Sequence, residues 1–249
     1  MYQRDLDRLH KIRSACTVCN GIGYKEVEKP DGILIEDCAC VQRIEKEIAL
    51  IEANIPLTYR RWNMKKLNEQ FLVTNKISIS HINKYIRNID FNLNRGRGIW
   101  FAGPPGTAKS SMICYIMRMA LNKKYSVYYD TASHLISLLF QSTMERDPEA
   151  RATVKNIIKN VHLLAIEEID KRDLGEKQTD RHGSMAGKLF YQFLSDVYNA
   201  GLSLMISSNE TFEETIPTLP VWIQDRFKSL MFITIKGASG REDMRNADS

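Results

Sequence analysis

From Gly98 onward, short apolar runs alternate with segments of helical periodicity. The apolar runs cover 98–103, 126–131, 161–169, 203–210 and 231–237, and the helical segments cover 110–124, 132–142, 184–200 and 221–230. Strands that alternate with helices predict a parallel β-sheet covered by helices on both faces. Ligands bind such sheets at the carboxyl ends of the strands. The sequence therefore predicts an α/β domain over 98–249 with its functional site at that edge.

The loop after the first of these strands reads GPPGTAKSS. It comprises Gly103, Pro104, Pro105, Gly106, Thr107, Ala108, Lys109, Ser110 and Ser111. Phosphate-binding loops follow the pattern GxxxxGK and then Ser or Thr, between a strand and a helix whose N-terminus favours negative charge. We expect ATP to bind here, with Lys109 on the β and γ phosphates and Ser110 on Mg²⁺; a coincidental turn is the alternative.

Ala108 stands where this pattern has its last glycine. An alanine adds only a methyl group, provided that its backbone does not need a positive φ. We therefore expect nucleotide binding to survive the replacement.

Two carboxylates, Glu167 and Glu168, end the apolar strand VHLLAIEE about 60 residues after the loop. We expect Glu167 to hold Mg²⁺ and Glu168 to orient and deprotonate the attacking water. The usual residue at the first position is Asp, and Glu167 is one methylene longer. A purely structural role for both is the alternative, although two charges at the end of a buried strand are unfavourable without a purpose.

Four further residues are candidates for the reaction. Asn209 follows the strand SLMISS and could position the water, or it is a plain turn residue. Arg226, Arg241 and Arg245 are candidates for stabilising the charge on a transferring phosphoryl group, from the same subunit or from a neighbour. Ordinary surface arginines are the alternative.

Four of the five cysteines lie in the first 40 residues, as Cys16 and Cys19 and as Cys38 and Cys40. Clustered thiols in a reducing compartment favour a metal over disulfides, and zinc takes four thiolates in a tetrahedron. We expect a structural Zn²⁺ site across a short hairpin, with four free cysteines as the alternative. Cys114 lies in an apolar helical run and is assigned to the core.

The segment between the cysteines and the α/β domain is basic. Residues 41–55 have helical periodicity and precede Pro56, and residues 54–97 contain nine Lys or Arg and two Asp or Glu, interleaved with aromatic residues. This composition suits single-stranded nucleic acid, although a solvated helical face would look the same. The expected division is a zinc module and connecting helix at 1–53, a basic segment at 54–97 and an ATPase domain at 98–249.

Composition excludes membrane insertion. The chain has 249 residues, of which 43% are hydrophobic and 26% charged. No stretch approaches the ~18 apolar residues of a membrane span, and the amino terminus is too charged for a signal peptide. We expect a cytoplasmic protein.

Taken together, GPPGTAKS, LLAIEE, SSN, QDRF and GASGR resemble the AAA+ ATPases, and more narrowly the DnaC/IstB-like helicase loaders of bacteria and phages. The resemblance implies a P-loop AAA+ sheet with a reduced or absent carboxyl-terminal lid, in an oligomer that uses ATP, Mg²⁺ and single-stranded DNA to deliver a replicative ring helicase. It also implies that Arg226 is an arginine finger, that Arg241 is a second sensor arginine, and that residues 131–151 contact DNA.

Two alternatives remain open within the same fold. One is an IstB-type transposition ATPase that acts on duplex DNA and directs a transposase, which a zinc module disfavours mildly. The other is an ATP-gated adaptor with little turnover, in which bound ATP orders an oligomer or a partner surface. ATP turnover separates the adaptor from the enzymes, and binding to a helicase or to a transposase separates the first two.

Overall fold

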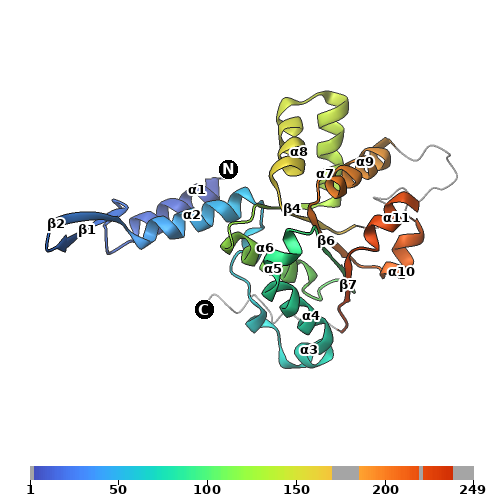
Figure 1. The fold of residues 1–249 in the computed structure, drawn as a ribbon, viewed down its shortest axis with the longest axis horizontal. Helices are drawn as coiled ribbons and strands as arrows, with labels where there is room; N and C mark the ends of the chain where they lie inside the picture. The colour runs from blue at the N-terminus through green and yellow to red at the C-terminus, as the bar shows by residue number, and fades with distance from the viewer. Residues whose placement is uncertain (1–2, 170–184, 219–220, 238–249) are drawn as a thin grey trace. The chain divides into compact units, whose positions relative to one another are not determined.

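The computed structural model of the protein describes residues 3–169, 185–218 and 221–237 (Figure 1). The chain forms two compact units, Met1–Pro56 and Leu57–Ser249. No helix in the described part of the chain is long and apolar enough to cross a membrane.

The amino-terminal unit contains two helices and one β-hairpin. Its elements are α1 (Gln3–Ser14), β1 (Tyr24–Lys29), β2 (Gly32–Asp37) and α2 (Ala39–Glu52). The strands pair antiparallel from Tyr24 opposite Asp37 to Lys29 opposite Gly32, so the hairpin expected between the two cysteine pairs is present. Arg8 of α1 and Glu47 of α2 form an ion pair of 2.9 Å that joins the two helices.

The second unit begins with short helices that pack on the sheet. They are η1 (Leu57–Tyr59), η2 (Met64–Lys66), α3 (Glu69–Thr74), α4 (Lys76–Arg87) and α5 (Ile89–Leu93). The Asn75 side chain donates to the carbonyl of Lys236 and accepts from its N–H, at 3.0 and 2.8 Å. The Tyr85 hydroxyl donates to the carbonyl of Arg97 at 2.6 Å. These bonds fix the basic segment to both the beginning and the end of the sheet.

Five parallel strands form the sheet, in the order β4-β5-β6-β3-β7. They are β3 (Ile99–Ala102), β4 (Val127–Thr131), β5 (Leu163–Glu167), β6 (Ser203–Ser208) and β7 (Met231–Thr234). The chain crosses from β3, inside the sheet between β6 and β7, to β4 at the far edge, and later from β6 past β3 to β7, so the direction of the connections reverses between β3 and β6. Ligands bind parallel sheets where the order reverses in this way. The α/β fold predicted from the sequence is confirmed.

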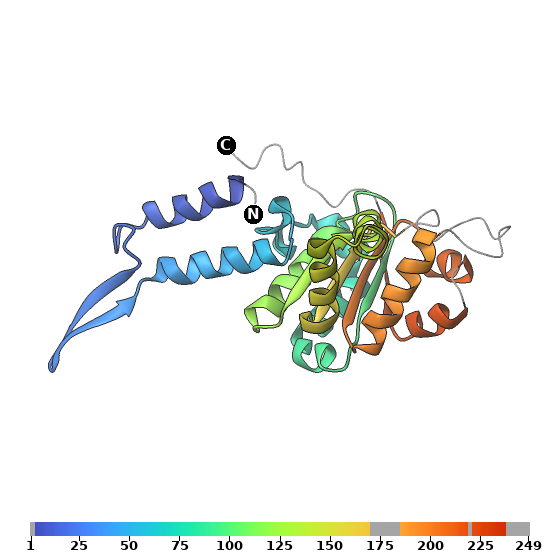
Figure 2. The same cartoon turned by 90° about the horizontal axis from the view of Figure 1, so that it is seen from above.

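Helices cover both faces of the sheet (Figure 2). The covering elements are α6 (Lys109–Asn122), α7 (Ala132–Phe140), α9 (Met185–Asn199), α10 (Phe212–Thr215), η4 (Ile216–Thr218) and α11 (Val221–Phe227). Trp100, Leu164 and Ile206 point to one face and pack with residues of α7, α9 and α11. Because successive strand residues face opposite ways, Phe101 and Ala165 point to the other face, where α6 packs on β4, β5 and β6.

One long helix, α8 (Pro148–Asn160), is absent from the sequence prediction. It lies beside α7 (Figure 1), and the π-helical turn η3 (Gln141–Glu145) connects the two. The Asp147 carboxylate caps α8 by accepting the N–H groups of Glu149 and Ala150 at 2.8 and 2.9 Å. Asp followed by Pro is a helix-start signal that the sequence contained and that the periodicity analysis missed.

Candidate nucleotide and metal sites

The loop between β3 and α6 has the backbone of a phosphate cradle. Gly103 and Gly106 both have positive φ, at 149° and 82°. A Cβ on Gly103 would lie 2.2 Å from the carbonyl oxygen of Ile235, so only glycine fits at that position. The loop ends at the N-terminus of α6, a helix of 14 residues. The free N–H groups at such a helix end stabilise phosphate oxygens.

Ala108 has a φ of 63°, in the left-handed region. The condition under which this alanine would add only a methyl group is therefore not met, and whether ATP binding survives the replacement stays a prediction. An L-residue with a Cβ is less stable there by roughly 1–2 kcal/mol. The strain lies at the position that precedes α6, where the pattern places a glycine because glycine adopts positive φ freely.

Lys109 lies inside the loop and reaches the end of a second strand. Its Nζ donates to the carbonyls of Gly103 and Pro104 at 2.6 and 2.9 Å, and to Oδ1 of Asn209 at 3.0 Å. Burial lowers the pKa of its ammonium group. The structure thus brings together two residues that the sequence analysis selected separately, 100 positions apart.

Ser110 and Glu167 form the second pair. The Ser110 hydroxyl donates to Oε2 of Glu167 at 2.5 Å. The other carboxylate oxygen, Oε1, is buried and has no hydrogen-bond partner among the described residues. Burial raises the pKa of the Glu167 carboxyl to about 7. A hydroxyl and a buried carboxylate with a free oxygen are the hard oxygen donors that Mg²⁺ takes, so these residues fit that ion.

Glu168 follows immediately and lies at the end of β5 with a φ of 58°. Its N–H donates to Oγ of Ser207 at 3.0 Å, and the next N–H, of Ile169, donates to the Ser207 carbonyl at 3.0 Å. Ser207 lies buried in β6, and these two bonds hold the turn after β5 against it. The two glutamates on either side of the start of this turn differ in exposure: Glu167 is 3% exposed, whereas Glu168 is exposed. Backbone strain of this kind is characteristic of functional sites.

A cavity of 130 Å³ lies at this edge of the sheet. It is lined by Tyr59, Pro105, Gly106, Thr107, Ala108, Lys109, Ser110, Glu167, Glu168, Ser207, Ser208 and Asn209. The sequence analysis missed Tyr59, Ser207 and Ser208. The two serines stand directly before Asn209 in the motif SSN, where the strand continuing to the site could have indicated them. Tyr59 carries no comparable signal.

Arg226 does not line this cavity. Its guanidinium lies 5.1 Å from the ring centroid of Tyr198 and donates to the Ser195 hydroxyl, both on α9. Within one chain, therefore, Arg226 is held by α9 and not by the phosphate loop. Arg241 and Arg245, and the carboxyl-terminal segment on which the reduced lid was expected, lie outside the described residues.

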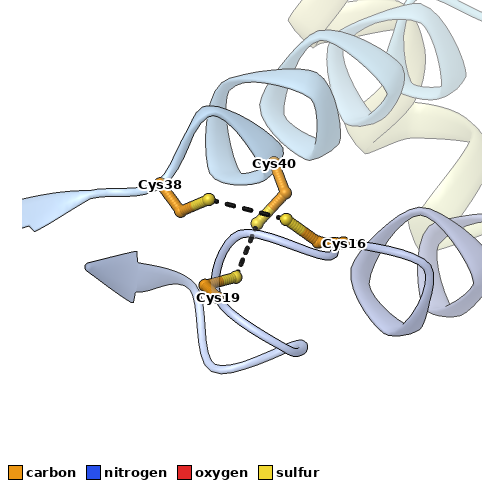
Figure 3. A group of neighbouring side chains, drawn as sticks. All are labelled: Cys16, Cys19, Cys38 and Cys40. Carbon is orange, nitrogen blue, oxygen red and sulfur yellow. Dashed lines mark hydrogen bonds between the residues drawn. The ribbon is translucent and has the colours of Figure 1, made fainter.

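The four amino-terminal cysteines form one cluster (Figure 3). All four Sγ atoms lie within 4.8 Å of one another, with 3.6 Å between Cys16 and Cys38 and 3.4 Å between Cys19 and Cys40. Thiolates about 2.3 Å from a tetrahedral zinc ion are about 3.8 Å apart. The N–H of Gly23 lowers the pKa of Cys19 to about 6, and burial raises that of Cys40 to about 12. The sulfur positions fit a structural zinc ion.

The parallel sheet, the phosphate cradle and the acidic end of β5 define a P-loop AAA+ ATP-binding domain. A family model described as IstB-like ATP binding protein matches residues 67–227. The chain belongs to this family. A search of curated protein sequences finds no match.

Three solved structures share the fold. The DnaC helicase loader has a TM-score of 0.52 at 17% identity and covers 68% of this chain and 100% of its own. DnaI has a TM-score of 0.55 at 14% identity and covers 75% of this chain and 94% of its own. AMPPCP-bound DnaA from Aquifex aeolicus has a TM-score of 0.51 at 17% identity and covers 70% of this chain. The match spans about half (51%) of that DnaA chain.

Proposed function

We propose that this chain is an ATP-dependent helicase loader that binds single-stranded DNA and delivers a replicative ring helicase during replication initiation in the cytoplasm. The observation that carries the proposal is a four-cysteine module joined in one chain to an AAA+ ATP-binding unit. The likeness to the DnaC helicase loader and to DnaI, each covered almost completely, supports it. In this proposal the cysteine module holds the helicase and the basic segment 54–97 binds the DNA.

The residues around the 130 Å³ cavity have separate roles in the proposed hydrolysis. Lys109 exchanges its contacts with loop carbonyls for the β and γ phosphates, and Asn209 holds the Lys109 ammonium and the attacking water. Ser110 and Glu167 would hold Mg²⁺, which neutralises charge on the phosphates. Glu168, exposed in the cavity, accepts the proton of the water. Substitution tests the last role: Glu168→Gln should retain ATP affinity and lose hydrolysis, and hydrolysis at the parental rate would contradict it.

Arg226 is proposed to act on the nucleotide of a neighbouring subunit. It lies outside the cavity of its own chain, and its contacts with Ser195 and Tyr198 keep its guanidinium on α9. The spread charge of a transferring phosphoryl group is best stabilised by a guanidinium, and a neighbour can supply it. Arg241 is proposed to act as the second sensor arginine.

Mixing two inactive variants tests the role in trans. Lys109→Ala subunits keep Arg226 but lack a working phosphate site, and Arg226→Ala subunits keep the site. A mixed oligomer should regain turnover where an intact site meets an intact arginine. A mixture as inactive as its components, although native mass measurement shows mixed oligomers, would contradict the assignment.

Co-purification with the replicative ring helicase of the same source tests the loader function. We expect the helicase to bind the parental protein with ATP, and to be lost from a Cys38→Ser/Cys40→Ser variant that still binds ATP. Retention of the helicase by that variant would remove the cysteine module from the interaction.

The family match favours a second candidate, a transposition ATPase of the IstB type. Such a protein would assemble on duplex DNA and bind a transposase. Affinity for duplex over single-stranded DNA in the presence of ATP, with no helicase binding, would favour this candidate. The strain at Ala108 supports a third, an ATP-gated adaptor, which ATP binding without turnover would identify.

A further inference from the structure

A second and larger cavity lies at the opposite ends of the parallel strands. Its volume is 680 Å³. Gly98 precedes β3, Leu202 precedes β6 and Met231 begins β7, and all three line it. The strands are parallel, so this cavity is at their amino ends, whereas the nucleotide cavity is at their carboxyl ends. The roles proposed for ATP leave it unused.

Two arginines at this cavity are held in place without being neutralised. Arg95 and Arg97 both line it and are exposed. Their guanidinium carbons lie 4.9 and 4.8 Å from the ring centroid of Phe91. No carboxylate of a described residue forms an ion pair with either arginine. A ring under a guanidinium restricts its motion without cancelling its charge, so both groups are ready to bind an anion.

An aromatic ring lines the same cavity. Tyr198 of α9 is 51% exposed, and the Arg226 guanidinium on its ring helps to fix its position. Two glycines also line the cavity: a Cβ on Gly96 would lie 2.8 Å from the carbonyl oxygen of Gly201, so the two backbones pack closely, and a Cβ on Gly201 would meet no atom within 4 Å. The missing side chain of Gly201 therefore leaves open space at the cavity that Tyr198 also lines.

We propose that this cavity binds single-stranded nucleic acid, with phosphates on Arg95 and Arg97 and a base stacked on Tyr198. Paired cations beside an exposed aromatic ring are the chemistry of a single-strand site, because the cations track the backbone and the ring takes unpaired bases. A duplex offers its phosphates but keeps its bases stacked on one another. The inference rests on the proposed DNA binding and deepens it by naming the site, which is distinct from the segment 131–151.

Binding of a fluorescently labelled oligothymidylate, followed by anisotropy with ATP over a range of salt concentrations, tests the cations. Arg95→Gln/Arg97→Gln is compared with Lys155→Gln/Lys159→Gln, which removes the same charge from exposed residues of α8, outside both the basic segment 54–97 and the segment 131–151. We expect the arginine variant to bind at least about tenfold more weakly, with a salt dependence lower by about 1.4 for two lost phosphate contacts. The lysine variant should stay within about twofold of the parent. Equal losses in the two variants would overturn the site.

Photo-crosslinking of the parental protein with an oligonucleotide that carries 5-iodouracil tests the stacked base without a substitution, and a Tyr198 variant adds a second measurement. The expected crosslink maps to Tyr198, or to Phe91, whose ring contacts Arg95 and Arg97, and Tyr198→Leu should weaken binding about tenfold. A crosslink confined to 131–151, or equal competition by duplex, would overturn the cavity while leaving DNA binding intact. No binding of single strands by the parental protein would instead reject the proposed function.

Discussion

Each of the two units of this chain is stabilised internally by a different kind of interaction. In the second unit, large apolar side chains such as Trp100, Phe101 and Phe190 are completely buried between the sheet and its helices. In the amino-terminal unit, the hairpin exposes Ile33 and Ile35 at 67% and 65%. The buried cluster beside that hairpin consists of three cysteines, Cys19, Cys38 and Cys40, with Cys16 packed against it.

The difference indicates which unit needs a ligand in order to fold. A sheet covered on both faces buries enough apolar surface to be stable alone. A hairpin without an apolar core is marginal in water, and a small module of this kind is stabilised by metal binding. The amino-terminal unit should therefore respond to metal and the second unit to nucleotide. The three tryptophans, Trp62, Trp100 and Trp222, all lie after residue 56, so their fluorescence reports on the second unit alone.

The largest expected effect is on the metal module. Cys38→Ser/Cys40→Ser should remove about one bound zinc per chain, and zinc binding of this kind contributes roughly 10 kcal/mol to folding. Residues 3–56 should then lose protection from hydrogen exchange, while the tryptophan unfolding transition of the second unit stays unchanged. Metal analysis and hydrogen exchange measure the two halves of the prediction. Absence of zinc from the freshly reduced parental protein would mean that metal does not stabilise the amino-terminal unit.

The converse substitution is Lys109→Ala. It removes the ammonium group that lies between the loop carbonyls and Asn209, and it should weaken ATP binding at least about 100-fold, or roughly 3 kcal/mol. Titration with a fluorescent ATP analogue measures this loss. Zinc content should not change, and Lys188→Ala on the exposed surface of α9 is the matched control that should leave ATP affinity intact. Loss of zinc in Lys109→Ala would mean that the units do not respond separately.

Much of the fold and of the site was within reach of the sequence. The strand–helix alternation gave a parallel sheet, and the motifs at the strand ends selected Lys109, Ser110, Glu167 and Asn209, which lie together. What a linear pattern cannot contain is backbone geometry and contact between distant segments. The positive φ of Ala108 is a property of the folded loop, and the support of Glu168 by Ser207 and the position of Tyr59 depend on how distant segments of the chain meet.

Within the second unit, the ionisation of Glu167 should make the stability depend on pH. Burial raises its pKa to about 7 from an ordinary value of 4.5, so the folded protein favours the neutral acid. Stability without nucleotide should therefore fall as pH rises from about 4.5 to about 7 and level off above that. Glu167→Gln mimics the neutral acid and should remove this fall, which makes the variant more stable than the parent by roughly 3 kcal/mol at pH 8.

Urea unfolding followed by tryptophan fluorescence at pH 5 and pH 8, without Mg²⁺, measures this effect. Near pH 5 the two proteins should differ little. Adding Mg²⁺ with ATP should stabilise the parent at pH 8 more than the variant, because only the carboxylate offers a charged ligand. Equal stability of parent and variant at both pH values would mean that Glu167 is ionised without penalty in the folded protein.

The smallest expected effect concerns Ala108. Its φ of 63° strains an alanine, so Ala108→Gly should raise the stability of the second unit by about 0.5–1 kcal/mol, after the loss of one buried methyl group is subtracted from the strain that is relieved. Ala120→Gly in α6, the helix that follows Ala108, is the matched control, because Ala120 is fully buried within the helix. There the same change should lower stability by at least about 1 kcal/mol. Urea unfolding by tryptophan fluorescence compares the two, and a loss of similar size in both variants would show that Ala108 is not strained. If ATP turnover also rises in Ala108→Gly, the alanine slows the site as well as straining it.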